Sequence, residues 1–395
     1  MIRIRSEDRY SPLHFLAALG AGGAAVTFYV QLMFLVEHPD APVVTIDHVW
    51  PILREGNPLA GLLAGLALLA MLGFAAIHVR LLVWNLLQWL RCRHTAAWRA
   101  LLDSHAATGL MAIPLTLAMT VNVTFLTAMV LVPGLWRDIE ALFPFALLAL
   151  FSIGVYALYR YAHIIVHLVR TDRFAALTSH SLNHMTAVFA FAMVAMGLAA
   201  PGCMSEQAYS SAIGRYGSLT FAGIALSLGI LHLAFALRAL LAGRVGVVAS
   251  PGLWVAIPVL TLLGIVAIRN RLGPLQGFDD ALLQDDLLVL TGIVLIVQLA
   301  FGALGYRVMQ RLGYFRDYLH GEQRHPGSYA LICPGIALFV FGMYFISYGL
   351  VKTGVVEAFS AVHISLLATL TLLQWKTLAT LFRLNSRLLG SPLAA

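Results

Sequence analysis

Ten long apolar stretches are the feature of this sequence that most constrains its fold. A helix needs roughly 20 consecutive apolar residues to cross a hydrocarbon core about 30 Å thick. The chain is 60% hydrophobic and only 11% charged, which leaves too few charges to cover a soluble globule of 395 residues. We therefore predict an all-α integral membrane protein with a single transmembrane domain over residues 1–395. We place the ten spans near 12–36, 58–90, 107–133, 141–169, 182–201, 215–242, 249–269, 287–309, 328–351 and 358–383.

Basic and acidic residues gather in different connections. Arginines concentrate at both termini and between even and odd spans, whereas the odd-to-even connections carry acids such as Asp40, Asp138 and Asp279. The positive-inside rule then predicts that both termini are cytoplasmic. The net charge of +7 is thus expected to orient loops in the lipid bilayer, and we expect no nucleic-acid partner. Lysine occurs only at Lys352 and Lys376, which is typical of a GC-rich bacterial genome, so we place the chain in a bacterial inner membrane.

The odd spans share a repeated pattern at their start. Each is preceded by a Ser-Pro, Ser-His or His-Pro pair, namely Ser11-Pro12, Ser104-His105, Ser179-His180, Ser250-Pro251 and His325-Pro326. Three odd spans also carry an internal proline, at Pro114, Pro258 and Pro334. Odd spans are rich in small residues, which let helices pack closely, whereas even spans end in aromatic and basic residues. We predict five helical hairpins, with inner odd helices around a central pore and outer even helices facing lipid. The alternative is an irregular ten-helix bundle in which these pairs only mark helix starts.

Carboxylates are missing from the middle of the spans. All 18 Asp and Glu residues fall in a terminus, a connection or the outermost turn of a span, whereas proton-coupled transporters and cation channels generally place carboxylates at depth. Basic and polar side chains do enter the spans, and they would favour an anion. The candidate anion-attracting or polar lining residues are Thr120, Asn122, Thr124, His184, Arg160 and Arg80. The structural alternative is that the polar groups bond neighbouring helices and the basic ones reach lipid phosphate.

Phenylalanines follow the internal prolines. A phenyl ring in a narrow pore would close it by excluding water, although phenylalanine is also common packing material in membrane helices. Phe339, five residues beyond Pro334 in the apolar run Ser328–Val351, is the predicted plug. The pore and gate candidates are Phe339, Pro334, Phe341, Phe345, Phe125 and Phe189.

Ten spans in five hairpins, prolines in odd helices, cytoplasmic termini and no buried carboxylates resemble the tellurite-resistance and dicarboxylate transporter superfamily, which includes the plant slow anion channels. The resemblance covers roughly residues 12–383 and is architectural, with one local match at LICPGIALFV, which contains Phe339. It implies a non-enzymatic, anion-selective channel or exporter for a small inorganic or organic anion, without a cofactor. It also implies a pore closed by a phenylalanine of the ninth helix, and a homotrimer. The chain departs from the family in its many intramembrane histidines and in its long first outer connection.

The histidines support a rival hypothesis. His163 and His167 are four residues apart and so share one helix face, and imidazoles at matched depth on different helices can hold a b-type haem. The alternative function is therefore a haem-binding membrane redox subunit, a b-type cytochrome or a quinol-reactive protein. The candidate ligands of its haem b are His163, His167, His232, His363, His78 and His184. A third hypothesis is a non-transporting membrane partner of a redox or sulfur-metabolising enzyme.

Overall fold

The computed structural model describes residues 10–170, 181–272 and 281–389, and this part of the chain is helical, without a β-strand. Ten of its helical segments are long and apolar enough to cross a membrane, which confirms the prediction of an all-α, ten-span membrane protein. Their helices are α1 (Phe15–Leu35), α3 (Pro58–Cys92), α5 (Ala112–Leu131), α6 (Ile139–Arg170), α8 (Ser181–Met204), α9 (Ala208–Leu241), α10 (Ala256–Leu272), α11 (Ala281–Arg311), α12 (Ile332–Tyr344) and α13 (Ala361–Leu388). Helix α12 continues as the π-helix η8 (Phe345–Val351), and the short helices α2 (Ile46–Glu55), α4 (Ala96–Leu102), η4 (Leu135–Asp138) and η6 (Phe315–His320) lie in connections.

The odd and even spans differ sharply in burial. In the apolar segments of the odd spans, which contain α1, α5, α8, α10 and α12, between 50% and 83% of the residues are buried. In the even spans, which contain α3, α6, α9, α11 and α13, only 17% to 28% are buried. Large apolar side chains such as Leu69, Leu148 and Ile296 stand exposed on these even helices. The odd helices are therefore the inner ones, and the even helices present apolar side chains outward, as helices in contact with lipid do.

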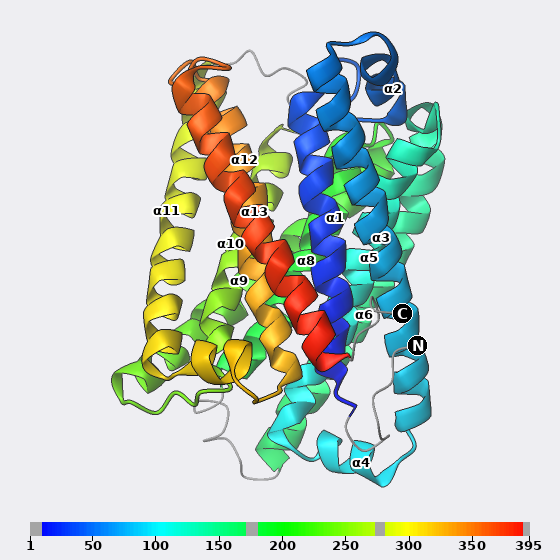
Figure 1. Cartoon of the computed structure of the whole chain (residues 1–395). Helices are drawn as coiled ribbons and strands as arrows, with labels where there is room; N and C mark the ends of the chain where they lie inside the picture. The colour runs from blue at the N-terminus through cyan, green and yellow to red at the C-terminus, as the bar shows by residue number, and fades with distance from the viewer. Residues whose placement is uncertain (1–9, 171–180, 273–280, 390–395) are drawn as a thin grey trace.

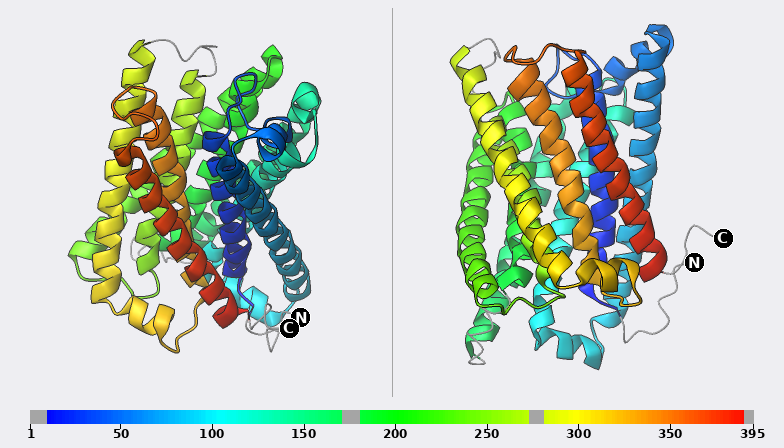
Figure 2. Two further views of the ribbon diagram at one scale, coloured as in Figure 1. Left: turned by 45° about the horizontal axis from the view of Figure 1, so that its top comes forward. Right: turned by 60° about the vertical axis from the view of Figure 1, so that its left-hand side comes forward.

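The five inner helices close a ring. In chain order, α1 packs against α5, α5 against α8, α8 against α10 and α10 against α12, and α12 packs back against α1. Outer helices back this ring, with α3 against α1, α9 against α8 and α13 against α12. Both figures show α11 and α13 on the outside of the bundle (Figures 1 and 2). The ring thus follows the order of the sequence.

The two ends of the bundle carry different charges. Helix α1 begins and α13 ends at the same end (Figure 1), as an even number of spans requires. We call this the basic end, because the arginine-rich connections after α3 and α11 lie there. The opposite, acidic end carries the α1–α2 connection and α2, with Glu37, Asp40 and Asp47. That the basic end faces the cytoplasm stays a prediction.

Short 3₁₀ helices lead into four of the inner helices. Helices η2 (Pro12–His14), η3 (His105–Met111), η5 (Ser250–Val255) and η7 (Pro326–Leu331) precede α1, α5, α10 and α12. The Ser11 and Ser104 hydroxyls accept backbone N–H groups at 3.3 Å and 3.2 Å, and His325 Nδ1 accepts the Gly327 N–H at 3.1 Å. Three of the repeated pairs therefore cap the starts of η2, η3 and η7. At η5 the Ser250 hydroxyl instead donates to the Val247 carbonyl oxygen at 2.7 Å. Ser179-His180 lies outside the described residues.

The three internal prolines occupy one equivalent position. Pro114, Pro258 and Pro334 are each the third residue of their α-helix, directly after the 3₁₀ helix. The first residues of an α-helix have no N–H partner within it, so a proline is tolerated there. The prolines consequently mark the change from 3₁₀ to α-helix near the basic end.

Candidate functional site

A cavity of about 90 Å³ lies among the inner helices and α6, toward the acidic end. All five inner helices contribute to its wall, for example through Val30, Asn122, Gly197, Arg269 and Tyr344. Apart from these, the wall is built mostly from aliphatic, methionine and phenylalanine side chains. The few polar groups in it therefore decide what the cavity can bind.

Arg269 is the only charged residue among the described residues that line this cavity. Its Nη1 donates a hydrogen bond to the Met196 carbonyl oxygen at 3.3 Å and lies 3.7 Å from the Met196 sulfur. No ion pair joins it to a described carboxylate. A guanidinium has five N–H donors, so donors remain for a ligand. An anion 4 Å away would be attracted by about 4 kcal/mol at an effective dielectric constant of about 20.

The neighbouring arginine on α10 behaves differently. Arg271 forms an ion pair with Asp286 of α11, with 2.5 Å between Nη2 and Oδ2, and both side chains are about half exposed. Residues two apart on a helix point to different sides. Helix α10 thus directs one paired arginine outward and one arginine without a described acidic partner into the cavity.

Three tyrosines stand around Arg269. The Tyr344 hydroxyl lies beside the guanidinium, and Tyr29 and Tyr348 lie near enough to interact with its charge. The Tyr29 hydroxyl donates to the Val44 carbonyl oxygen at 2.9 Å. The Tyr344 and Tyr348 rings meet edge to face at 5.4 Å, and Phe34 packs edge to face on both. A phenol hydroxyl can donate a hydrogen bond without adding charge, so Tyr344 can assist Arg269 in holding an anion.

Two of the predicted lining and gate residues lie in the cavity wall. Asn122 donates to the Ala118 carbonyl oxygen at 3.1 Å and contacts the Met193 sulfur at 3.6 Å. Phe125, one turn further along α5, also lines the cavity and is half-buried. Asn122 is thus tied to its own helix and to α8, and its amide is the polar group on the α5 side.

Apolar side chains of the inner helices lie below the cavity. Ile336 lies one helical turn before Val340, which lines the cavity, so it continues the same face of α12 toward the basic end. A Cβ placed on Gly23 of α1 would lie 2.7 Å from Ile336 Cδ1 and 3.5 Å from Met119 Cε. Side chains of α5 and α12 therefore meet over a glycine of α1, and a larger residue there would collide with them.

Helix α8 also places apolar side chains on the face below the cavity. Met193 lies one turn before the cavity residue Gly197, and Phe189 lies one turn before Met193 on that face. Met193 is 3% exposed and Phe189 is 5% exposed. We call Met119, Met193 and Ile336 the apolar layer. Phe189, a predicted gate residue, continues this face of α8 toward the basic end.

The phenylalanines of span nine point to neighbouring helices. A Cβ on Gly264 of α10 would lie 2.5 Å from a ring carbon of Phe341, and one on Gly292 of α11 would lie 3.7 Å from Phe345. Phe339 is 1% exposed and does not line the cavity. It shares a helix face with Gly335, which abuts Thr377 of α13. Its role as a plug stays a prediction.

Three other predicted lining residues lie away from the ring interior. Thr120 bonds His78 Nε2 of α3 at 3.0 Å, while His78 Nδ1 bonds the Ala18 carbonyl oxygen at 2.7 Å. Thr124 is exposed one turn beyond Thr120, and Arg80 is exposed on α3. In the structure His78 and Thr120 fasten α3 to α1 and α5.

The remaining predicted basic residues gather at the basic end. A second cavity, of about 160 Å³, lies between α6, α8 and η3, and its wall includes Arg160, His163, His167 and His184 together with the carboxylate of Asp103. Arg160 and His184, both predicted as anion-attracting residues, thus line one cavity. They are separate from the cavity that contains Arg269.

Two of the candidate haem ligands, His184 and His232, do not form a matched haem pair. His184 and His232 stack face to face with ring centroids 4.9 Å apart and planes 8° apart, and Tyr161 bonds His232 Nε2 at 2.7 Å. A haem held by two histidines needs one imidazole on each side of the iron, and rings stacked this closely leave no room for a porphyrin. His363 lies in the first turn of α13, at the acidic end. Among the described residues no group of three or more His, Cys, Asp or Glu could hold a metal ion.

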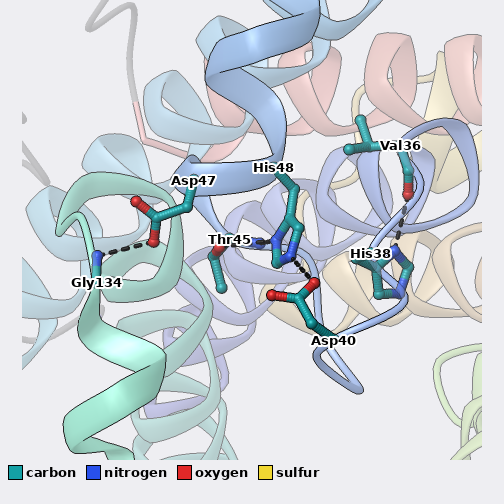
Figure 3. A network of polar contacts seen from close by, with 7 residues as sticks. All are labelled: Val36, His38, Asp40, Thr45, Asp47, His48 and Gly134. Carbon is teal, nitrogen blue, oxygen red and sulfur yellow. Dashed lines mark hydrogen bonds and ion pairs between the residues drawn. The ribbon is translucent and has the colours of Figure 1, made fainter.

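The α1–α2 connection (residues 36–45) covers one side of the cavity. Its Val43 lines the cavity and is 2% exposed. Asp47 of α2 accepts the Gly134 backbone N–H at 2.8 Å, and His48 caps the start of α2 and contacts Asp40 at 2.7 Å (Figure 3). With the bond from Tyr29 to Val44, these contacts hold the connection against the ends of the inner helices.

Sequence reasoning did not identify Arg269, Tyr29, Tyr344 or Tyr348. One signal was present: Arg269 and Arg271 stand at the end of the bundle whose connections carry most of the acidic residues. An arginine that departs from the charge distribution of the loops is a candidate for a functional group.

Comparison of the chain with models of protein families, with characterised proteins and with solved structures finds no match in any of the three. The site is therefore interpreted from its own residues.

Proposed function

We propose that the protein is an anion-selective channel or exporter, with the interior of the five-helix ring as its pathway and the cavity at Arg269 as the anion-binding entrance. The observation that carries this proposal is a single cation without a described acidic partner, set among tyrosines in a cavity that all five inner helices line. The absence of carboxylates from the described cavity wall supports an anion over a cation. The cargo is a small inorganic or organic anion.

The apolar layer is the proposed closure of this pathway. A narrow ring of apolar side chains blocks ions because water does not fill it. Met119 and Met193 have flexible, unbranched side chains, so a modest rotation of the inner helices would move them aside. In this proposal the layer takes the role that the sequence assigns to Phe339.

The surroundings of the protein belong to the same proposal. The exposed apolar faces of the outer helices fit a lipid bilayer, and the arginine-rich basic end fits the cytoplasmic side of a bacterial inner membrane. The homotrimer is implied by the family resemblance, and cross-linking of the membrane-embedded protein would test it.

Reconstitution in liposomes tests the function. We expect selective anion flux from the wild type, a strongly reduced flux from Arg269→Gln, and near wild-type flux from Arg271→Gln. Arg271 is the matched control, because it lies on the same helix but is paired outward with Asp286. Cation-selective flux, no flux from the wild type, or equal flux from Arg269→Gln and the wild type would overturn the proposal.

A further inference from the structure

Two histidines face each other where the α1–α2 connection meets α2. The ring centroids of His38 and His48 are 6.1 Å apart, and both rings lie beside the connection in Figure 3. His38 Nδ1 lies 2.8 Å from the Val36 carbonyl oxygen, to which it donates. His48 Nδ1 accepts the Thr45 backbone N–H at 3.1 Å, so this nitrogen carries no proton in the capped state. The capped start of α2 therefore requires an uncharged His48.

The charges around His38 make it sensitive to protons. The titratable groups that face it are His48 from α2, Asp40 from the connection and Lys352 from the end of η8. Burial, together with the nearby His48 and Lys352, lowers the pKa of His38, and the hydrogen bond from His48 lowers the pKa of Asp40. With neutral histidines, Lys352 and Asp40 sum to a net charge of zero (+1 − 1). Protonation of both histidines raises this sum to +2 (+1 − 1 + 2).

Acidification weakens the connection in two ways. The charged His38, His48 and Lys352 repel one another, and a proton on His48 Nδ1 removes the acceptor that caps α2. The pair between His48 and Asp40 opposes this, but an ion pair with a carboxylate as exposed as Asp40 contributes little. Since the pKa of His38 is lowered in the folded protein, its linkage also reduces the stability of the connection as the pH falls.

We propose that acidification on the acidic-end side of the membrane releases the α1–α2 connection from the cavity, so that protons control access to Arg269. Val43 is the residue that leaves the cavity wall when the connection moves. The inference rests on the proposed function in that it treats the cavity as the entrance of an anion pathway. Histidine is suited to this role, because its charge changes between about pH 5 and 8.

Cysteine accessibility in the reconstituted full-length protein tests the inference without any flux measurement. Val43→Cys is the reporter, and Val355→Cys, at the same end and 59% exposed, is the matched control. Both are made after Cys92, Cys203 and Cys333 are replaced. Each is labelled with a charged, membrane-impermeant methanethiosulfonate at about pH 7.5 and about pH 5.5, on either side of the ordinary histidine pKa. At each pH the labelling rate of Val43→Cys is divided by the labelling rate of Val355→Cys. This ratio cancels the change in thiolate fraction with pH.

We expect this ratio to rise roughly tenfold on acidification. In His38→Asn/His48→Asn the amides can replace the donor to Val36 and the acceptor for Thr45 but cannot become charged, so the ratio should stay low at both pH values. A wild-type ratio that does not rise, or a double variant that rises as much as the wild type, overturns the inference. If the double variant does not fold, His38→Asn and His48→Asn are tested singly. Each should show a smaller rise of the labelling ratio on acidification than the wild type, and a rise equal to that of the wild type in both overturns the inference.

The outcomes separate this inference from the proposed function. Labelling that depends on pH in a protein without anion flux would overturn the function and leave the proton-dependent connection in place. Anion flux from a protein whose labelling does not change with pH would support the function and overturn the proton-dependent connection.

Discussion

The hydrogen bond from Arg269 Nη1 to the carbonyl oxygen of Met196, at 3.3 Å, joins two neighbouring inner helices at the wall of the cavity. The acceptor is a neutral backbone group of α8, so the bond positions the guanidinium without cancelling its charge. An arginine paired with a carboxylate would offer a ligand far less attraction. The arrangement keeps a fixed positive charge available inside the ring.

Replacement of Arg269 should separate the effect of charge from that of shape. Arg269→Gln is expected to lower anion flux about 10- to 100-fold, since a hydrogen bond to a charged group contributes about 1.5–3 kcal/mol. Arg269→Lys keeps the charge but not the planar fork, and we expect it to retain more flux than the Gln variant. Initial rates in proteoliposomes at equal protein content measure this. Equal losses of anion flux in Arg269→Gln and Arg269→Lys would show that a positive charge at this position does not by itself support the flux.

Truncation of the apolar layer should open the resting protein. Met119→Ala and Ile336→Ala are each expected to raise anion leak, because they widen the closure below the cavity. Phe339→Ala is expected to lower the free energy of unfolding by about 3–5 kcal/mol without raising leak, since its side chain is buried and does not line the cavity. Leak and thermal unfolding are measured on the same preparations. If Phe339→Ala leaks and neither Met119→Ala nor Ile336→Ala does, Phe339 and not the apolar layer closes the pathway.

Gly335 should not tolerate a side chain. A Cβ there would lie 2.0 Å from Thr377 Oγ1 of α13, and overpacking of this kind destabilises proteins by about 1–3 kcal/mol. Gly73→Ala on α3 is the control, because nothing lies within 4 Å of its added Cβ and alanine favours a helix. Thermal unfolding in detergent compares the two. Gly335→Ala/Thr377→Ala should recover part of the loss, and a Gly335→Ala variant as stable as the control would contradict the close packing of α12 on α13.

The free energy of unfolding should decrease at alkaline pH because of Tyr314. Burial raises the pKa of its hydroxyl to about 12, and this hydroxyl lies 2.8 Å from Ser328 Oγ. An unfolded tyrosine ionises near pH 10, so the contribution of Tyr314 is fully present below about pH 10 and is lost as the pH rises toward 12. The loss amounts to at most about 2.7 kcal/mol. Unfolding between about pH 9 and 12 should show a shallower decline for Tyr314→Phe, and identical declines would contradict this role.

The spans and their two classes could be predicted from the sequence, because a bilayer imposes length and apolarity on every helix that crosses it. The face that each inner helix turns to the interior could not. Inner helices are apolar on all sides, so no periodic stripe marks one face. Phe339 and Tyr344 lie on the same span, yet only Tyr344 lines the cavity, and packing against α1, α10 and α13 decides this.

Arg269 shows a different limit of the sequence. It stands at the last residue of the predicted span 249–269, where an arginine is most simply interpreted as a loop charge. Its significance depends on Asp286, which pairs with Arg271 and leaves Arg269 without a described acidic partner. Which of two nearby arginines finds a carboxylate depends on how α11 packs against α10, and this is information that one helix does not contain.

The closed order of the inner helices has a consequence for the connectivity of the chain. Because α12 packs on α1 and α13 also contacts α1, the last hairpin is a neighbour of the first. Helix α13 ends at the same end of the bundle at which α1 begins. A circular permutant that joins these two ends and is opened in the connection between α3 and α5 would keep every helix neighbour and place its new termini at the basic end. This ring of helices can thus accept more than one point at which the chain begins.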